Sequence, residues 1–103
     1  MGKKFDDYKN IEHNGFRPTP IQAHRAEEQI ELIFLKGKGL FGLFSKPKPM
    51  HYSELRKAYK ENFPAIEQRE PGLIDQIVQP EILRQLSFTV DDNGMVIYKA
   101  SDH

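Results

Sequence analysis

The sequence predicts an α+β domain, in which three to four short helices are followed by a C-terminal β-hairpin. Three observations predict this class. Apolar residues recur at helical spacing in several short stretches between residues 20 and 86. Prolines stand at the ends of these stretches, where they interrupt helices. Near the C-terminus, two runs rich in β-branched and aromatic residues flank Asn93-Gly94, a dipeptide typical of hairpin turns.

The first helix is predicted over about residues 20–36, with its end somewhere within residues 32–36. Thr19 is a favourable N-cap, and Pro20 suits the first helical position, where a missing N–H costs nothing. Gln22 stands three residues after Thr19 and completes a capping box. The residues expected on the inner face of this helix are Ala26, Ile30, Ile33 and Phe34.

A short strand at about residues 50–52 and a second helix come next. Ser53 is the predicted N-cap, and Pro64 ends the helix. Its apolar face consists of Leu55, Ala58, Tyr59 and Phe63. The polar residues 67–70 are predicted to form a turn.

The third helix is predicted to follow Pro71-Gly72, with Leu73, Ile74, Ile77 and Val78 as its apolar residues. Pro80 ends or kinks this helix. One or two further helical turns over residues 80–86 carry Ile82, Leu83 and Leu86.

The hairpin is predicted to pair residues 88–92 with residues 95–99. Asn93-Gly94 accepts the two positive φ angles of a two-residue type I′ turn. This turn places Val90 opposite Ile97, with Phe88 and Met95 on the same inward side.

This order of helices, short strand and hairpin resembles the winged-helix superfamily, in which a helical trio is followed by a two-stranded wing. The resemblance covers roughly residues 20–99 and rests on element order. The polar residues 1–18, which contain Asn14-Gly15 and Pro18, are predicted to form an N-terminal arm, and residues 19–103 a single winged-helix-like domain. Winged helices that read DNA place their third helix in the major groove.

The charge of the chain is zero overall but unevenly distributed. Residues 17–60 hold nine basic and four acidic side chains, whereas residues 61–103 hold three basic and eight acidic ones. A basic cluster can neutralise phosphates, so nucleic-acid binding through residues 36–60 is one expected function. Its candidate residues are Lys36, Lys38, Lys46, Lys48, Arg56, Lys57 and Lys60.

A second candidate surface is the apolar run between Lys38 and Lys46. Exposed apolar residues with basic flanks suit docking on a protein, and the candidate residues are Leu40, Phe41, Leu43 and Phe44. These side chains could equally belong to the core. The favoured function is a non-enzymatic interaction or regulatory module that binds a protein or a second copy of itself, and nucleic-acid binding is the alternative.

Other classes of function find little support in the sequence. The absence of cysteine excludes disulfides, thiol catalysis and Cys-ligated zinc. His24 lies near Glu27 and Glu28, but a metal site needs further ligands. We therefore expect no enzyme activity, no cofactor and no metal.

The start lacks the apolar stretch of a secretory signal, and no apolar run reaches the roughly 18 residues of a membrane span, so a cytoplasmic location is expected.

Overall fold

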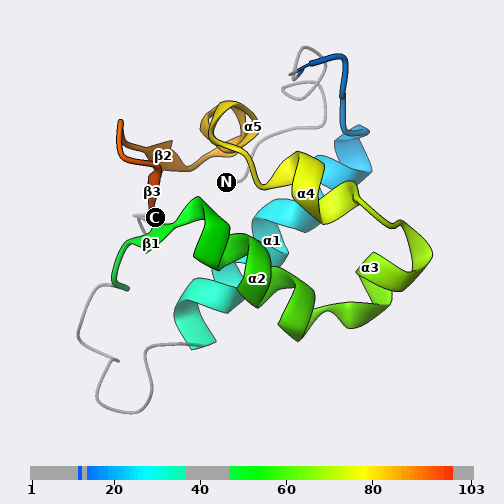
Figure 1. The fold of residues 1–103 in the computed structure, drawn as a ribbon, viewed down its shortest axis with the longest axis horizontal. Helices are drawn as coiled ribbons and strands as arrows, with labels where there is room; N and C mark the ends of the chain where they lie inside the picture. Colours follow the sequence, from blue (N-terminus) through cyan, green and yellow to red (C-terminus); the bar gives the residue numbers. More distant parts are fainter. Residues whose placement is uncertain (1–11, 13, 37–46, 99–103) are drawn as a thin grey trace.

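The computed structural model describes residues 12, 14–36 and 47–98, which contain five helices and three short strands. The helices are α1 (Pro20–Lys36), α2 (Tyr52–Asn62), α3 (Pro64–Arg69), α4 (Leu73–Ile77) and α5 (Pro80–Leu86). The strands are β1 (Met50–His51), β2 (Thr89–Val90) and β3 (Met95–Ile97). Figure 1 shows the strands on the left of the molecule and α3 on the right. The predicted α+β class, with helices before a C-terminal hairpin, is confirmed.

Part of the predicted N-terminal arm, residues 12 and 14–18, is described. Phe16 packs against the core, and Pro18 is buried. The backbone carbonyl of Glu12 accepts a hydrogen bond from the side chain of Gln85 on α5, at 3.3 Å. The end of the arm that adjoins α1 is therefore attached to the helices.

α1 begins and ends where the sequence predicts. The hydroxyl of Thr19 accepts a hydrogen bond from the backbone N–H of Gln22 at 3.1 Å, and the Gln22 side-chain oxygen accepts from the Thr19 N–H at 2.9 Å. These two bonds form the predicted capping box. Pro20 occupies the first helical position, where the helix has no partner for an N–H.

The predicted inner faces of α1 and α2 are confirmed and form the centre of the core. Burying each large apolar side chain stabilises the fold by roughly 1.5–3 kcal/mol, so this face fixes how α1 is oriented. In α1 the four predicted residues are buried, and in α2 Leu55 and Tyr59 are buried while Ala58 and Phe63 are partly buried. The core continues through Ile66, Ile74, Ile77, Val78, Ile82, Leu83, Leu86, Phe88, Val90 and Val96.

The start of α2 differs from the prediction, because His51 and not Ser53 is its N-cap. The His51 Nδ1 atom accepts a hydrogen bond from the Ser53 N–H at 3.1 Å and lies 2.8 Å from the Ser53 hydroxyl. Ser53 already belongs to the helix. An imidazole nitrogen thus fills the role usually taken by a side-chain oxygen.

α3 (Pro64–Arg69) includes residues 67–69, which the sequence analysis predicted as part of a turn over residues 67–70. Pro64 ends α2, as predicted, but it also stands in the first turn of α3. Ile66 is buried and joins this short helix to the core. Gly72, with a φ of 87°, then reverses the chain into α4. The predicted break at Pro80 is confirmed, since α4 ends at Ile77 and α5 begins at Pro80.

The sheet is antiparallel, with strand order β1-β3-β2. β1 confirms the short strand predicted before α2. The hairpin register, however, is wrong in the prediction by one residue, because Val90 lies opposite Val96 and not opposite Ile97. A shift by one residue exchanges the two faces of a strand. Val96 is therefore the fully buried residue of β3, while Met95 and Ile97 are half-buried.

The turn explains this register. The Asp91 carboxylate accepts hydrogen bonds from the N–H groups of Asn93 and Met95, both at 2.9 Å. The Asp91 N–H donates to the Met95 carbonyl at 3.1 Å, so Asp92, Asn93 and Gly94 form a three-residue loop. Gly94 has a positive φ of 82° and Asn93 does not, which rules out the predicted type I′ turn.

Candidate interaction surface

The structure describes only part of the two predicted surfaces. The apolar candidates Leu40, Phe41, Leu43 and Phe44 lie outside the described residues, and so do Lys38 and Lys46. The docking role predicted for residues 40–44 therefore remains a prediction. The described basic candidates are Lys36, Lys48, Arg56, Lys57 and Lys60, and their surroundings differ.

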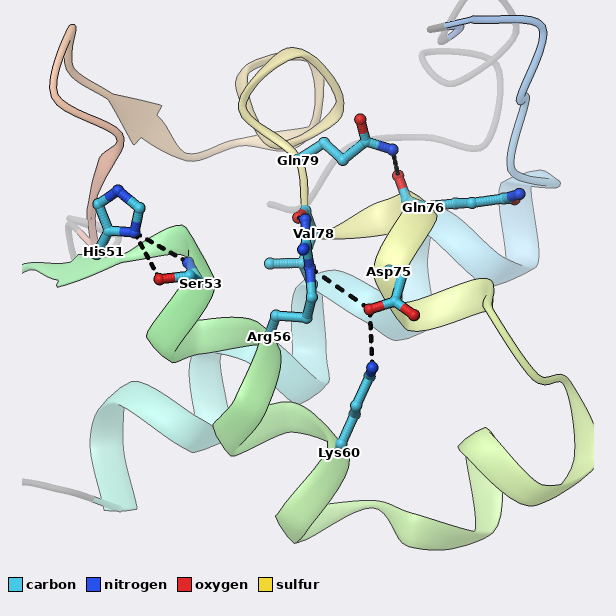
Figure 2. A network of polar contacts seen from close by, with 8 residues as sticks. All are labelled: His51, Ser53, Arg56, Lys60, Asp75, Gln76, Val78 and Gln79. Carbon is cyan, nitrogen blue, oxygen red and sulfur yellow. Dashed lines mark hydrogen bonds and ion pairs between the residues drawn. The ribbon is translucent and has the colours of Figure 1, made fainter.

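Two of these basic residues, Arg56 and Lys60, form ion pairs within the fold (Figure 2). The Asp75 carboxylate on α4 lies 2.8 Å from Lys60 Nζ and 3.6 Å from Arg56 Nε, both on α2. The Arg56 guanidinium also donates to the backbone carbonyl of Val78 at 2.8 Å and stands over the ring of Tyr52. These contacts link α2 to α4, and Asp75 offsets the charge that a phosphate would meet.

The remaining basic candidates are not among the ion pairs of Asp75. Lys36 donates to the Asn62 side-chain oxygen at 2.7 Å, at the C-terminal ends of α1 and α2. Lys48 precedes β1, and Lys57 lies on α2, and both are exposed. Among the described basic candidates, Arg56 and Lys60 therefore share the counter-charge of Asp75, whereas Lys48 and Lys57 are exposed.

His51 and Ser53 have the atom types of a base and a nucleophile and lie within hydrogen-bond distance, but they cap a helix. Both the hydroxyl and the N–H of Ser53 are directed at the same nitrogen of His51 (Figure 2). Near the end of α4, the Gln79 side chain donates to the Gln76 carbonyl.

Among residues 12, 14–36 and 47–98, no group of three or more potential metal ligands comes together.

The large hydrophobic side chains that the described residues leave exposed all lie on α1. Ile21 and Leu32 are 57% exposed, and Leu35 is 42% exposed. Arg25 and Glu28 are also exposed and stand between them. The five residues follow one another at intervals of four, three, four and three, which places them along one line of a helix. We call this line the outer stripe of α1.

An open groove of about 540 Å³ adjoins the C-terminal half of the outer stripe. Phe63, the residue that follows α2, contributes its partly buried ring to this groove. The groove is lined by Leu32, Ile33, Leu35, Lys36, Asn62 and Phe63. Leu32 and Leu35 thus belong both to the stripe and to the groove, and together they make one apolar surface with the Lys36–Asn62 hydrogen bond at its rim.

Tyrosines hold α1 on both edges of the outer stripe. The Tyr59 hydroxyl donates to the Gln29 side chain, and burial raises the pKa of Tyr59 while the charge of Arg25 opposes this shift. On the other edge, the Tyr98 hydroxyl donates to Glu31 at 3.3 Å, and its ring stacks on Phe34. Burial, with the negative charge of Glu31, raises the pKa of Tyr98. The stripe therefore stands on a helix fixed from two sides.

The sequence contains a signal for this surface in the apolar residues of α1 that lie outside its inner face. The inner face of α1 accounts for Ala26, Ile30, Ile33 and Phe34. Leu32 and Leu35 fall outside that face, and with Ile21 they form a second set at the spacing of a helix pair. Large apolar residues on both sides of one helix indicate two contact surfaces.

Comparison with known proteins adds no relative, since the chain significantly matches no protein-family model, no curated protein and no solved structure. Within the described residues, no helix combines the length and the apolar content that crossing a membrane requires.

Proposed function

We propose that the chain is a non-enzymatic protein-interaction module, and that its docking surface is the outer stripe of α1 with the adjoining groove. The observation that carries this proposal is the exposure of Ile21, Leu32 and Leu35 along one line of a helix. Leu32 and Leu35 form one apolar surface with the groove, and exposed apolar surfaces mark sites of association. The surface suits an amphipathic helix, whose apolar side chains recur at the same intervals.

The winged-helix resemblance is part of this proposal. In this proposal the β2–β3 hairpin corresponds to the wing, with β1 beside β3, and α4 and α5 together correspond to the third helix, which Pro80 divides. The inner residues of α5, Ile82, Leu83 and Leu86, are buried in the core. The turn of the hairpin carries Asp91 and Asp92, whose charges oppose phosphate. These features favour a winged-helix-like module that binds protein.

Nucleic-acid binding through residues 36–60 is the alternative function. The exposure of Lys48 and Lys57 favours it. The pairing of Arg56 and Lys60 with Asp75 weighs against it, because two of the candidate charges already have a counter-charge inside the fold. Protein binding therefore has the stronger support.

The proposal is tested by photo-crosslinking in cells, with benzoylphenylalanine placed at Leu32. A protein adduct is expected at this position, and it should disappear when Ile21→Asp is added, because Ile21 is the other end of the same stripe. Position 57, also exposed but outside the groove, is the matched control and should not give the same adduct. Unchanged circular dichroism of Ile21→Asp checks that the fold is kept, as expected for an exposed residue outside the core. Equal adducts at both positions, or none at position 32, would contradict the proposal.

A further inference from the structure

The outer stripe of α1 also indicates what binds to it. We propose that its occupant is a second copy of this chain, with the two α1 helices packed antiparallel about a two-fold axis; this inference rests on the proposed function. The intervals of four and three residues are those by which helices pair along a shared seam. A two-fold interface uses the same surface on both copies, so the stripe must be complementary to itself.

One antiparallel register satisfies this condition. In it, Ile21 lies opposite Leu32 of the partner subunit, and Arg25 lies opposite the partner's Glu28. The two-fold axis repeats both pairs, so two ion pairs stand at the centre and one apolar pair stands on each side. Glu28 lies 3.6 Å from His24 on its own helix, which is longer than a hydrogen bond and leaves the carboxylate able to contact the partner's Arg25.

The other arrangements match fewer residues of the stripe, whereas the register above leaves only Leu35 beyond the overlap. Parallel helices would place Arg25 opposite the partner's Arg25, and Glu28 opposite the partner's Glu28, so that like charges meet. An antiparallel register shifted by one heptad would place Glu28 opposite the partner's Leu32 and would leave Ile21 without an apolar neighbour. The alternation of apolar and charged residues along the stripe therefore selects both the direction and the register of the pair.

The extent of the contact sets the expected affinity. Residues 20–33 of each α1 overlap in this register, and a single pair of short helices is smaller than the roughly 1,600 Å² of a standard interface. We expect a reversible dimer with a Kd of about 10 to 100 µM, in the range of small transient interfaces.

Charge exchange tests the pairing directly. Sedimentation equilibrium of the purified chain over this concentration range should show dimer formation. Arg25→Glu alone and Glu28→Arg alone should each raise the Kd roughly tenfold or more, because each places like charges at both central pairs. An equimolar mixture of the two variants should form a heterodimer, since every central pair is then opposite in charge. Lys57→Glu, outside the stripe, is the control and should leave the Kd unchanged.

Disulfide trapping tests the register, and the absence of cysteine from the chain makes single replacements unambiguous. A mixture of Ile21→Cys and Leu32→Cys should crosslink rapidly. Ile21→Cys alone should not, because the two copies of position 21 are about 16 Å apart along the helix axis, far beyond the reach of a disulfide.

Three results would overturn the inference: no dimer up to millimolar concentration, a dimer that the charge variants leave unchanged, or self-crosslinking of Ile21→Cys alone. A photo-adduct from position 32 with a different protein, combined with a monomeric chain, would overturn self-association and leave the proposed function standing. No adduct together with a monomeric chain would overturn both.

Discussion

Replacing Gly94 by alanine should destabilise the protein far more than the same replacement at Gly72. Both glycines have positive φ angles, 82° and 87°, so an alanine at either position carries a similar backbone cost of about 1 kcal/mol. Their surroundings differ. A Cβ at Gly72 would have no heavy atom within 4 Å, whereas at Gly94 it would lie 2.8 Å from His51 Nε2 and 3.1 Å from the ring of Tyr52.

The contact with His51 determines the size of the difference. The ring cannot move away without weakening the cap of α2, because its Nδ1 atom accepts from the Ser53 N–H. Loss of a cap costs about 1 kcal/mol, and overpacking costs roughly 1–3 kcal/mol. The Gly94 carbonyl also accepts from the Tyr52 N–H at 2.9 Å, so the turn has little room to shift. We expect Gly94→Ala to lower the free energy of unfolding by about 2–4 kcal/mol, against about 1 kcal/mol for Gly72→Ala.

Urea unfolding followed by far-ultraviolet circular dichroism measures both changes, provided that the m-value stays constant. A double-mutant cycle with His51→Ala isolates the steric part, because Gly94→Ala should cost about 1 kcal/mol less once the imidazole is gone. Equal losses for Gly94→Ala and Gly72→Ala would refute the reasoning, since the turn would then not lie against His51.

Two further predictions concern the tyrosine at the edge of α1 and the basic residues. Burial raises the pKa of Tyr59, and Arg25 only partly opposes this, so its contribution to stability is present below pH 10 and is lost as the pH rises further. Tyr59→Phe should reduce the alkaline fall in the free energy of unfolding, measured by urea titrations above about pH 9; an unchanged slope would contradict this. In fluorescence anisotropy with random duplex and single-stranded DNA, little binding is expected even at low salt. Binding that falls steeply with salt, disappears in Lys48→Glu and Lys57→Glu, and strengthens in Asp75→Asn would instead favour the nucleic-acid alternative.

The elements that the sequence predicted well depend on short-range interactions. The capping box of α1 joins Thr19 and Gln22, three residues apart, and Pro80 separates α4 from α5 through its own ring. Each of these effects is present in any short peptide that contains the residues. α3 escaped prediction because its stretch is polar and too short for a helical period, and Ile66 alone connects it to the core.

The hairpin register depends on contacts that a dipeptide signal does not contain. Residues 91–94 fit a two-residue turn at Asn93-Gly94 as well as the observed three-residue loop. The carboxylate of Asp91 favours the longer loop, because it accepts from both Asn93 and Met95. Pairing of β1 with β3 then fixes Val96 in the core. One side chain therefore decides which face of the strand is buried.

The candidate sites show a similar division between local pattern and long-range contact. In the sequence, the basic residues near α2 resemble a phosphate-binding cluster. In the fold, the carboxylate of Asp75 on α4 offsets the positive charges of Arg56 and Lys60. For α1 the spacing of the outer stripe can be seen in the sequence, but only the structure shows that these residues are exposed. The inner face of α1 is already buried in the core, where α1 contacts α2. Ile21, Leu32 and Leu35 lie outside that core. The dimer proposed above would cover Ile21 and Leu32, and it would place Arg25 opposite Glu28 of the partner subunit.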